Sequence, residues 1–288
     1  MTFRLMPQDG SRFPDYVAGQ YIALRRDRCR LTKRVVEPAG GVRYVLDLDE
    51  SGRPKLGPVT HSYSIASAPF ETRQHGWLEF YLVLEKGADG TPGRLSSAFF
   101  EMEPVPGETV TYVDRITGNF TLARVAAGFE SVLLVGTGTG VAPFVSMIKQ
   151  LHHEADLGQV SPIRYTLIHA NRTCDELAYH QELLDIEALQ RFDFVYLPSV
   201  SRPTEKDVTE ARLGRGRANN LLRHLFGMPT KEATDVAPAL PRHISRTDMV
   251  KRLDPSRTVL LTCGNPLSMA DIEHVAGAQH IRFEKEDW

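Results

Sequence analysis

The stretch SVLLVGTGTGVAPF, residues 131–144, indicates how the second half of the 288-residue chain folds. An apolar run that ends in alternating glycines and continues into a helical pattern is typical of a parallel strand followed by a helix. Gly136, Gly138 and Gly140 let the backbone approach a phosphate closely, and the helix N-terminus adds unpaired amides. The turn predicts a dinucleotide site, although Val141 departs from the G-x-G-x-x-G spacing. The alternative is a tight turn that binds no ligand.

Strands and helices alternate after this turn, within residues 126–288. Continuous apolar strands joined by amphipathic helices imply a parallel sheet covered on both faces. We therefore expect an α/β nucleotide-binding domain here. Its expected elements are strands at 164–171, 192–200 and 257–264, helices at 175–190 and 218–227, and a loop insertion at 228–246.

The first part of the chain, residues 1–125, shows short segments of alternating polarity between clusters of Gly, Pro and Asp, which favours an antiparallel barrel or sandwich. The stretch GRLSSAFFEM predicts one short helix at 96–102. Residues 25–58 are expected to form a long connection. The fold class is thus two-domain, with an N-terminal antiparallel β-barrel and a C-terminal α/β parallel-sheet domain. The expected N-terminal strands are 19–24, 42–49, 61–67, 77–86, 108–114 and 119–122.

Composition excludes several classes of protein. The 34 basic and 36 acidic residues nearly cancel, so no overall field attracts nucleic acid or an anionic membrane. No apolar run is long enough to span a bilayer, and MTFRLMPQDG lacks the features of a signal peptide, so we expect a soluble, cytoplasmic protein without a membrane partner. The three cysteines are odd in number and far apart, which argues against a zinc or iron–sulfur site and against a disulfide framework.

The ends of two expected strands carry cationic groups. Arg172 ends the stretch HANR, and Ser201 and Arg202 end SVSR. Two guanidiniums and a hydroxyl at one sheet edge suit a phosphate dianion better than a ribose diol, and Arg217 could add a third cation. NADP is therefore favoured over NAD, although each arginine alone is more often a solvated surface charge.

Two further stretches have both an ordinary and a functional interpretation. HSYSIAS, residues 61–67, alternates as a half-buried strand does, but it also places the Tyr63 ring between two serines. Cys263, in TCGNP, is either a small buried residue or a polarizable atom close to a nicotinamide ring.

Six motifs occur in a fixed order, namely HSYS, GRLS, GTGTGVAP, VSR, TCGNP and a terminal Trp288. Together they resemble the ferredoxin/flavodoxin–NADP reductase family over almost the whole chain. The resemblance implies an FAD-binding barrel in residues 1–125 and an NADP-binding domain in residues 126–288, with the flavin at their junction.

The resemblance also implies roles for individual residues. Ser64, at the flavin N5 edge, and Cys263, beside the nicotinamide, would be catalytic. The NADP residues would be Gly136, Gly138, Gly140, Arg172, Ser201, Arg202, Arg217 and Asp271. The FAD residues would be His61, Ser62 as a spacer, Tyr63, Ser64, Tyr81, Leu82, Val83, Arg94, Leu95, Ser96, Thr139 and Trp288.

The chain departs from the family pattern at two of these places. His61 stands where the family has arginine, and because imidazole loses its charge around neutral pH we expect FAD affinity to fall between about pH 6 and 8. The C-terminus reads FEKEDW, which leaves Glu284 and Glu286 as alternative proton relays.

The implied activity is electron transfer between NADPH, as a hydride donor, and a one-electron carrier by way of FAD. The segment RRDRCRLTKR, residues 25–34, has six basic residues against one acid and is a candidate docking site for an acidic ferredoxin or flavodoxin, or else a solvated strand face. Three alternatives remain, an NAD(P)H-dependent flavin reductase or oxygenase reductase component, a non-catalytic flavin-binding redox sensor, and a nucleotide-binding protein that has lost flavin.

Overall fold

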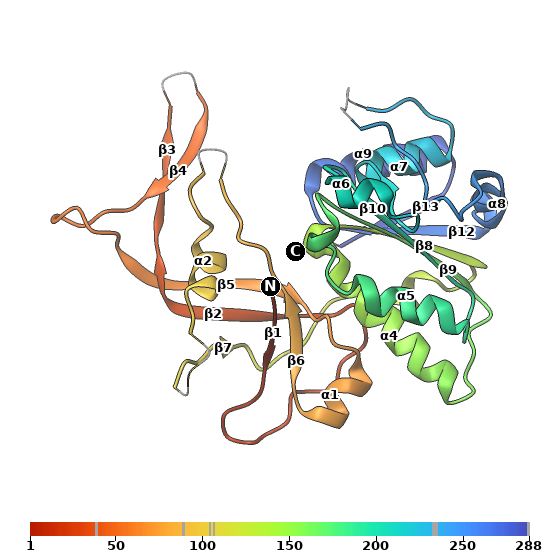
Figure 1. The fold of residues 1–288 in the computed structure, drawn as a ribbon. Helices are drawn as coiled ribbons and strands as arrows, with labels where there is room; N and C mark the ends of the chain where they lie inside the picture. The colour runs from red at the N-terminus through yellow and green to blue at the C-terminus, as the bar shows by residue number, and fades with distance from the viewer. Residues whose placement is uncertain (38–39, 88–89, 104, 106, 232–235, 287–288) are drawn as a thin grey trace.

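The computed structural model describes residues 1–37, 40–87, 90–103, 105, 107–231 and 236–286. An antiparallel N-terminal domain lies beside a C-terminal domain built on a parallel sheet (Figure 1). The predicted two-domain fold is thereby confirmed.

The N-terminal domain consists of antiparallel strands in separate sheets, two of which pack around one apolar core that includes Ile22, Leu24 and Phe80. Strand β2 pairs with β5 and β7, and β1 pairs with β6. The amide of Ala66, just after β5, donates to the carbonyl of Glu79 in β6, which joins the two sheets. The seam between β1 and the segment before β7 holds a groove of about 1000 Å³. The elements are β1 (Thr2–Leu5), β2 (Tyr21–Arg30), β3 (Thr32–Val36), β4 (Val42–Leu46), β5 (Leu56–Ser64), α1 (Pro69–His75), β6 (Leu78–Tyr81), α2 (Arg94–Phe100), β7 (Thr111–Tyr112) and α3 (Leu122–Val125).

The sequence suggested that residues 25–58 form a long connection, but the structure shows strands in this segment. Its first residues continue β2, and β3 and β4 then form a hairpin that projects from the domain (Figure 1). Thr32 is opposite Leu46, Arg34 opposite Tyr44 and Val36 opposite Val42, so these six residues share a face of the hairpin. The strand predicted at 42–49 is thus present as β4, whereas its partner β3 was not predicted.

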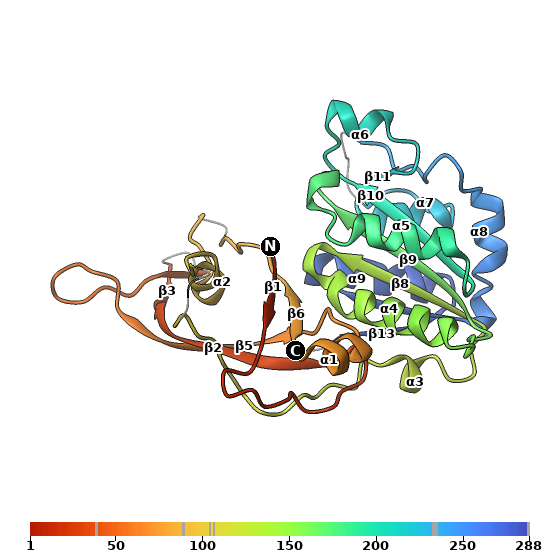
Figure 2. The same ribbon diagram turned by 60° about the horizontal axis from the view of Figure 1, so that its bottom comes forward.

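The C-terminal domain has a six-stranded parallel sheet in the order β11-β10-β9-β8-β12-β13. Helices α4 and α5 pack on one face through residues such as Phe144 and Leu183, and α7, α8 and α9 cover the other through Leu221, Met249 and Ile272 (Figure 2). The elements are β8 (Ser131–Thr137), the 3-10 helix η1 (Gly138–Val141), α4 (Ala142–Asp156), β9 (Arg164–Asn171), η2 (Cys174–Glu176), α5 (His180–Leu189), β10 (Phe194–Val200), α6 (Glu205–Thr209), β11 (Gly214–Arg215), α7 (Ala218–Leu225), α8 (Arg246–Arg252), η3 (Pro255–Arg257), β12 (Thr258–Cys263), α9 (Pro266–Ala278) and β13 (Arg282–Lys285).

Several element bounds differ from those predicted. Residues 119–122 are not a strand, because Phe120 turns into the C-terminal core and packs 5.8 Å from the Phe144 ring. The helix predicted at 96–102 begins at Arg94. Helix α5 begins only at His180, because Tyr179 before it is left-handed, with φ 62°. No helix in the described part of the chain is long and apolar enough to cross a membrane.

Candidate functional site

The glycine loop between β8 and α4 lies between two cavities. Thr137, at the end of β8, lines a cavity of about 350 Å³ in the C-terminal domain. Thr139, two residues later, lines a second cavity of about 490 Å³ that is otherwise mostly formed by the N-terminal domain. We call these the nucleotide cavity and the junction cavity. One short loop therefore contacts both.

The junction cavity brings together the described residues that the sequence assigned to FAD. Its walls come from β5, from the residues around the end of β6, from the start of α2 and from the glycine loop. Thr60, Glu85 and Ala142 also line it, and the sequence did not single them out. The full lining is Thr60, His61, Ser62, Tyr63, Ser64, Tyr81, Leu82, Val83, Glu85, Arg94, Leu95, Ser96, Thr139 and Ala142.

Local packing fixes the side chains of this cavity. The Tyr63 ring stands edge-on to Phe99 of α2, with the ring centroids 5.7 Å apart. The Tyr81 hydroxyl donates to the carbonyl of Glu176 in the C-terminal domain. The Ser96 hydroxyl accepts from the amide of Glu85 at 3.3 Å. The cavity therefore presents an aromatic ring, hydroxyls and the Arg94 side chain on a packed scaffold.

The nucleotide cavity gathers the cationic residues predicted at the strand ends. The N-termini of α7 and α9 also face it, and such ends favour anions. Thr137, Lys231 and Asn265 lie here as well and were not predicted. The lining is Thr137, Ala170, Asn171, Arg172, Ser201, Arg202, Arg217, Ala218, Asn219, Lys231, Asn265, Leu267 and Ser268.

Arg172 is already engaged within this cavity. Its Nε and one terminal nitrogen each lie 2.8 Å from a carboxylate oxygen of Glu176. The Glu176 carboxylate raises the pKa of this guanidinium and also partly neutralises its charge. A phosphate in the cavity therefore competes with Glu176 for Arg172.

The glycines of the loop have different tasks. A Cβ on Gly140 would lie 2.2 Å from the carbonyl oxygen of Cys263, so this glycine allows the loop to pack against β12. Gly136 likewise faces the backbone of Val141. Gly138 has φ +57°, and no other atom lies within 4 Å of where its Cβ would be. Of these three glycines, only Gly138 therefore has open space where its Cβ would be.

The two domains are joined by a polar contact behind the junction cavity. The Ser64 hydroxyl and the Cys263 thiol both donate to Oε2 of Glu286, each at 3.2 Å. Parallel pairing of β13 with β12 places Lys285 opposite Thr262, so Glu286 follows at the level of Cys263. Of the two C-terminal acids left open by the sequence, Glu286 is thus the one beside Ser64.

Burial shifts the acidity of this cluster. Glu286 is 4% exposed, and burial raises its pKa to about 7 in spite of the hydrogen bonds from Cys263 and Ser64. Burial, with the neighbouring Glu286 carboxylate, raises the pKa of the Cys263 thiol. Cys263 is fully buried and lines neither cavity, so its expected place beside a nicotinamide stays a prediction.

Asp271 does not line the nucleotide cavity, contrary to the expectation from the sequence. Its side chain is buried in α9, where it receives hydrogen bonds from Arg223 at 2.6 and 2.9 Å and from Asn219 at 2.8 Å. A buried carboxylate needs such partners, and Arg223 lowers its pKa against the effect of burial. Asp271 thus supports the wall of the cavity from beneath. Trp288 lies outside the described residues.

Comparison with known proteins shows similarity to pyridine-nucleotide oxidoreductases. Residues 134–237 match the oxidoreductase NAD-binding domain. A ferredoxin–NADP reductase A of Sorangium cellulosum is 29% identical over 223 residues, which are 74% of this chain and 65% of that protein. A flavodoxin/ferredoxin–NADP reductase of Rhodobacter capsulatus is 30% identical over 143 residues, 50% of this chain and 44% of that protein. The chain is therefore similar to ferredoxin–NADP reductases, and it spans less than two thirds of the length of these relatives.

Solved structures share the fold over the whole chain. The flavohemoglobin of Malassezia yamatoensis aligns with a TM-score of 0.60 at 14% identity and covers 99% of this chain and 56% of that one. The cytochrome b5 reductase domain of Ulva prolifera nitrate reductase aligns with a TM-score of 0.59 at 15% identity and covers 99% of this chain and 90% of that one. At this level of identity the likeness supports the two-domain fold alone.

Proposed function

We propose that the protein is an FAD-dependent oxidoreductase that transfers electrons between NADPH and a one-electron carrier such as ferredoxin or flavodoxin. The observation that supports this most directly is the glycine loop, with Thr139 in the junction cavity and Thr137 in the nucleotide cavity. Two cofactors on either side of one short loop would be close enough to react.

The residues of the junction cavity fit FAD. Tyr63 supplies a ring held by Phe99, and Arg94 supplies a cation for the pyrophosphate, with His61 nearby as a weaker contact. Bound FAD would accept a hydride from NADPH and release electrons one at a time. The Ser64 hydroxyl donates its only hydrogen to Glu286 and would therefore present an acceptor oxygen to the flavin, while Glu286 can hold a proton near neutral pH.

The nucleotide cavity fits the phosphorylated ribose of NADP. Ser201, Arg202 and Arg217 lie at one end of the sheet with two helix N-termini. Charge-assisted hydrogen bonds from guanidinium groups favour a dianion over a neutral diol. NADPH is therefore the proposed hydride donor rather than NADH.

The carrier is proposed to dock on the basic segment 25–34. Ion pairs within the chain occupy some of its cations and leave the others available for docking. Arg25, Arg26 and Arg30 are paired with Asp27, Glu108 and Glu101. No ion pair joins Arg28, Lys33 or Arg34 to a carboxylate in the described residues, and all three are exposed. These three cations are the part of the segment most open to an acidic carrier.

Removal of these charges tests the docking surface. A variant with glutamine at Arg28, Lys33 and Arg34 is expected to raise the KM for ferredoxin and to flatten its salt dependence, while ferricyanide reduction stays unchanged. The control removes equal charge from exposed Lys206, Arg242 and Lys251 of the C-terminal domain. Equal effects of both variants would discard the segment as a docking site.

The first experiment on the proposed function is an absorbance spectrum of the purified protein, followed by anaerobic titration with NADPH and then NADH. A flavin that NADPH bleaches at far lower concentration than NADH supports the proposal. A flavin that neither donor bleaches favours the redox-sensor alternative. Turnover with free flavin in place of ferredoxin would favour a flavin reductase. Reduction of an oxygenase partner would favour the role named for the ferredoxin reductase of carbazole 1,9a-dioxygenase, which shares this fold at a TM-score of 0.54.

A further inference from the structure

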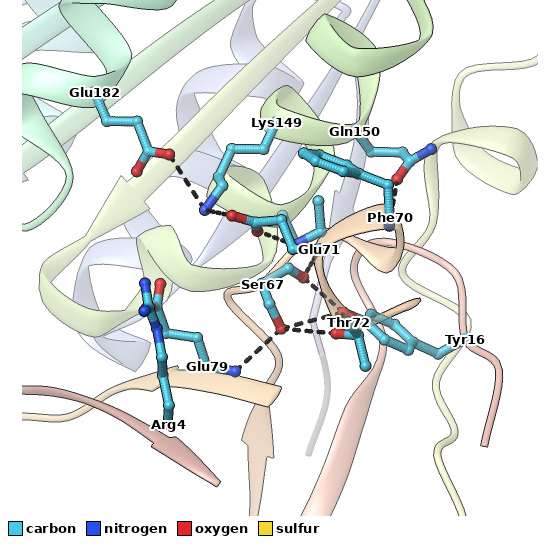
Figure 3. A network of polar contacts seen from close by, with 12 residues as sticks. Arg4, Tyr16, Ser67, Phe70, Glu71, Thr72, Glu79, Lys149, Gln150 and Glu182 are labelled. Carbon is cyan, nitrogen blue, oxygen red and sulfur yellow. Dashed lines mark hydrogen bonds and ion pairs between the residues drawn. The ribbon is translucent and has the colours of Figure 1, made fainter. Parts of the chain in front are cut away.

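Lys149 of α4 carries a charge in a buried position at the junction of the two domains (Figure 3). Its side chain is 7% exposed, and its Nζ lies 2.7 Å from Oε1 of Glu71 in α1 and 3.2 Å from Oε1 of Glu182 in α5. Its Nζ also lies 5.9 Å from the centre of the Tyr179 ring. A buried ammonium group is stable only with such partners, so Lys149 ties an acid of the N-terminal domain to one of the C-terminal domain.

Neighbouring side chains of α4 hold the same part of the N-terminal domain. Oε2 of Glu71 accepts from the amide of Ala68 at 2.7 Å, and Oε1 of Gln150 accepts from the amide of Phe70 at 3.2 Å. The Phe70 ring stacks on His153, with centroids 4.0 Å apart and an angle of 11°. Residues 68–71 are therefore fixed against the helix by ionic, polar and stacking contacts together.

The residues between β5 and the segment 68–71 are also held by hydrogen bonds. The Ser146 hydroxyl of α4 donates to the carbonyl of Ser67 at 2.6 Å, and the Tyr16 hydroxyl donates to the same carbonyl at 2.9 Å. The Ser67 hydroxyl accepts from the amide of Glu79 in β6 at 3.1 Å. The segment that follows Ser64 is thus hydrogen-bonded to α4 and to β6 at Ser67.

Both ends of this arrangement lead to the proposed cofactors. Helix α4 continues directly from the glycine loop, whose Thr139 lines the junction cavity, and β5 ends at Ser64 in the same cavity. We infer that Lys149 is a positioning residue. By bridging Glu71 and Glu182, it sets the distance between β5, which would contact the flavin, and the glycine loop, which would contact the dinucleotide. This inference rests on the proposed function.

The test compares four variants. Lys149→Met removes the bridge, and Lys149→Met combined with Glu71→Gln also removes the buried carboxylate that the first variant leaves unpaired. Lys149→Arg keeps the positive charge, and we expect it to retain most of the wild-type rate of flavin reduction and the wild-type distance distribution. Lys251→Met, at an exposed lysine of α8 remote from the junction, is the matched control for loss of one charge.

The first readout is the single-turnover rate of flavin reduction by NADPH in stopped flow. We expect both Met variants at Lys149 to lower this rate by about tenfold to a hundredfold, because small displacements of reacting groups cost that much. FAD retention and the NADP⁺ dissociation constant are expected to change by less than about twofold, since neither cavity is altered. A purely structural role would instead lower thermal stability and cofactor binding together.

The second readout needs no cofactor. It is the distance distribution between spin labels at exposed Thr111 on β7 and His274 on α9, in a chain with Cys174→Ser so that the half-buried native thiol is not labelled. The Lys149→Met variants are expected to broaden this distribution, and Lys149→Arg and Lys251→Met are not. If NADPH fails to bleach the wild-type flavin, the proposed function is wrong, and the distance distribution alone then decides whether Lys149 positions the domains.

Two results would overturn the inference. One is an unchanged distance distribution in a folded Lys149→Met/Glu71→Gln variant. The other is a broadened distribution with an unchanged rate of flavin reduction, because domain alignment would then not control the reaction.

Discussion

The hydroxyl of Ser64 on β5 donates to the carboxylate of Glu286, 222 residues further along the chain and in the other domain. The same oxygen accepts from the Cys263 thiol. A single buried carboxylate therefore links the end of β5 to the end of β12. Because its pKa is raised to about 7, this contact changes character within the physiological pH range.

Glu286 makes stability depend on pH. An acid whose pKa is raised from its ordinary 4.5 to about 7 binds more protons when folded, so stability falls as pH rises between these values. Relative to Glu286→Gln, the wild type should lose up to about 3 kcal/mol of unfolding free energy between pH 5 and pH 8. Urea unfolding of the cofactor-free proteins at several pH values measures this. Parallel pH profiles for the two proteins would mean that Glu286 titrates normally.

Ser64 is expected to act on the reaction more than on binding. Ser64→Ala removes the hydroxyl oxygen at the proposed flavin edge and one of the two groups that hold Glu286, so the rate of flavin reduction should fall about tenfold to a hundredfold. Ser51→Ala, at an exposed turn that lines neither cavity, is the matched control and should leave the rate nearly unchanged. Equal rates for the Ser64→Ala variant and the wild type would remove Ser64 from the reaction.

The sequence specified the parallel sheet because its strands are buried on both faces and read as continuous apolar runs. It did not specify β13, whose four residues Arg282–Lys285 are mostly polar and are ordered by pairing with β12. The place of Glu286 follows from that pairing alone. The local sequence pattern therefore could not show whether Glu284 or Glu286 lies beside Ser64.

The position of a residue around its helix explains why Asp271 does not line the nucleotide cavity and why the role of Lys149 was not predicted. Asp271 shares the buried face of α9 with Ile272 and Val275, so its carboxylate points inward to Arg223 and not into the cavity. Lys149 shares the buried face of α4 with Val145 and Ile148. A charged residue on an apolar helical face signals a buried ion pair, and its partners become visible only once the domains are placed together.

Selectivity for NADPH is expected to depend on Arg202. Loss of a charge-assisted hydrogen bond to the 2′-phosphate should raise the KM for NADPH about tenfold to a hundredfold in Arg202→Ala, with little change for NADH. Glu176→Gln should act in the opposite direction, because it releases Arg172 from its ion pair. Steady-state kinetics with both coenzymes measures this. A parallel change for NADH and NADPH would argue against a 2′-phosphate site.

His61 is expected to limit FAD affinity because imidazole is shorter than a guanidinium group. His61→Arg introduces a permanent cation at the exposed edge of the junction cavity, which should tighten FAD binding about tenfold. Fluorescence titration of the apoprotein with FAD measures this effect. If the variant binds FAD no more tightly than the wild type, His61 does not contact the phosphates.

The glycine loop allows packing and binding to be separated. Gly140→Ala places a methyl group against the carbonyl of Cys263, so it should lower the unfolding free energy by about 3 kcal/mol or more. Gly138→Ala meets no atom and strains only the left-handed backbone, which costs about 1 to 2 kcal/mol. If Gly138 opens space for the dinucleotide, its alanine variant should bind NADP⁺ weakly while remaining folded, as chemical unfolding and titration of the same samples would show. Normal NADP⁺ binding by Gly138→Ala would place the dinucleotide elsewhere, because the added methyl group occupies the only open position at these three glycines.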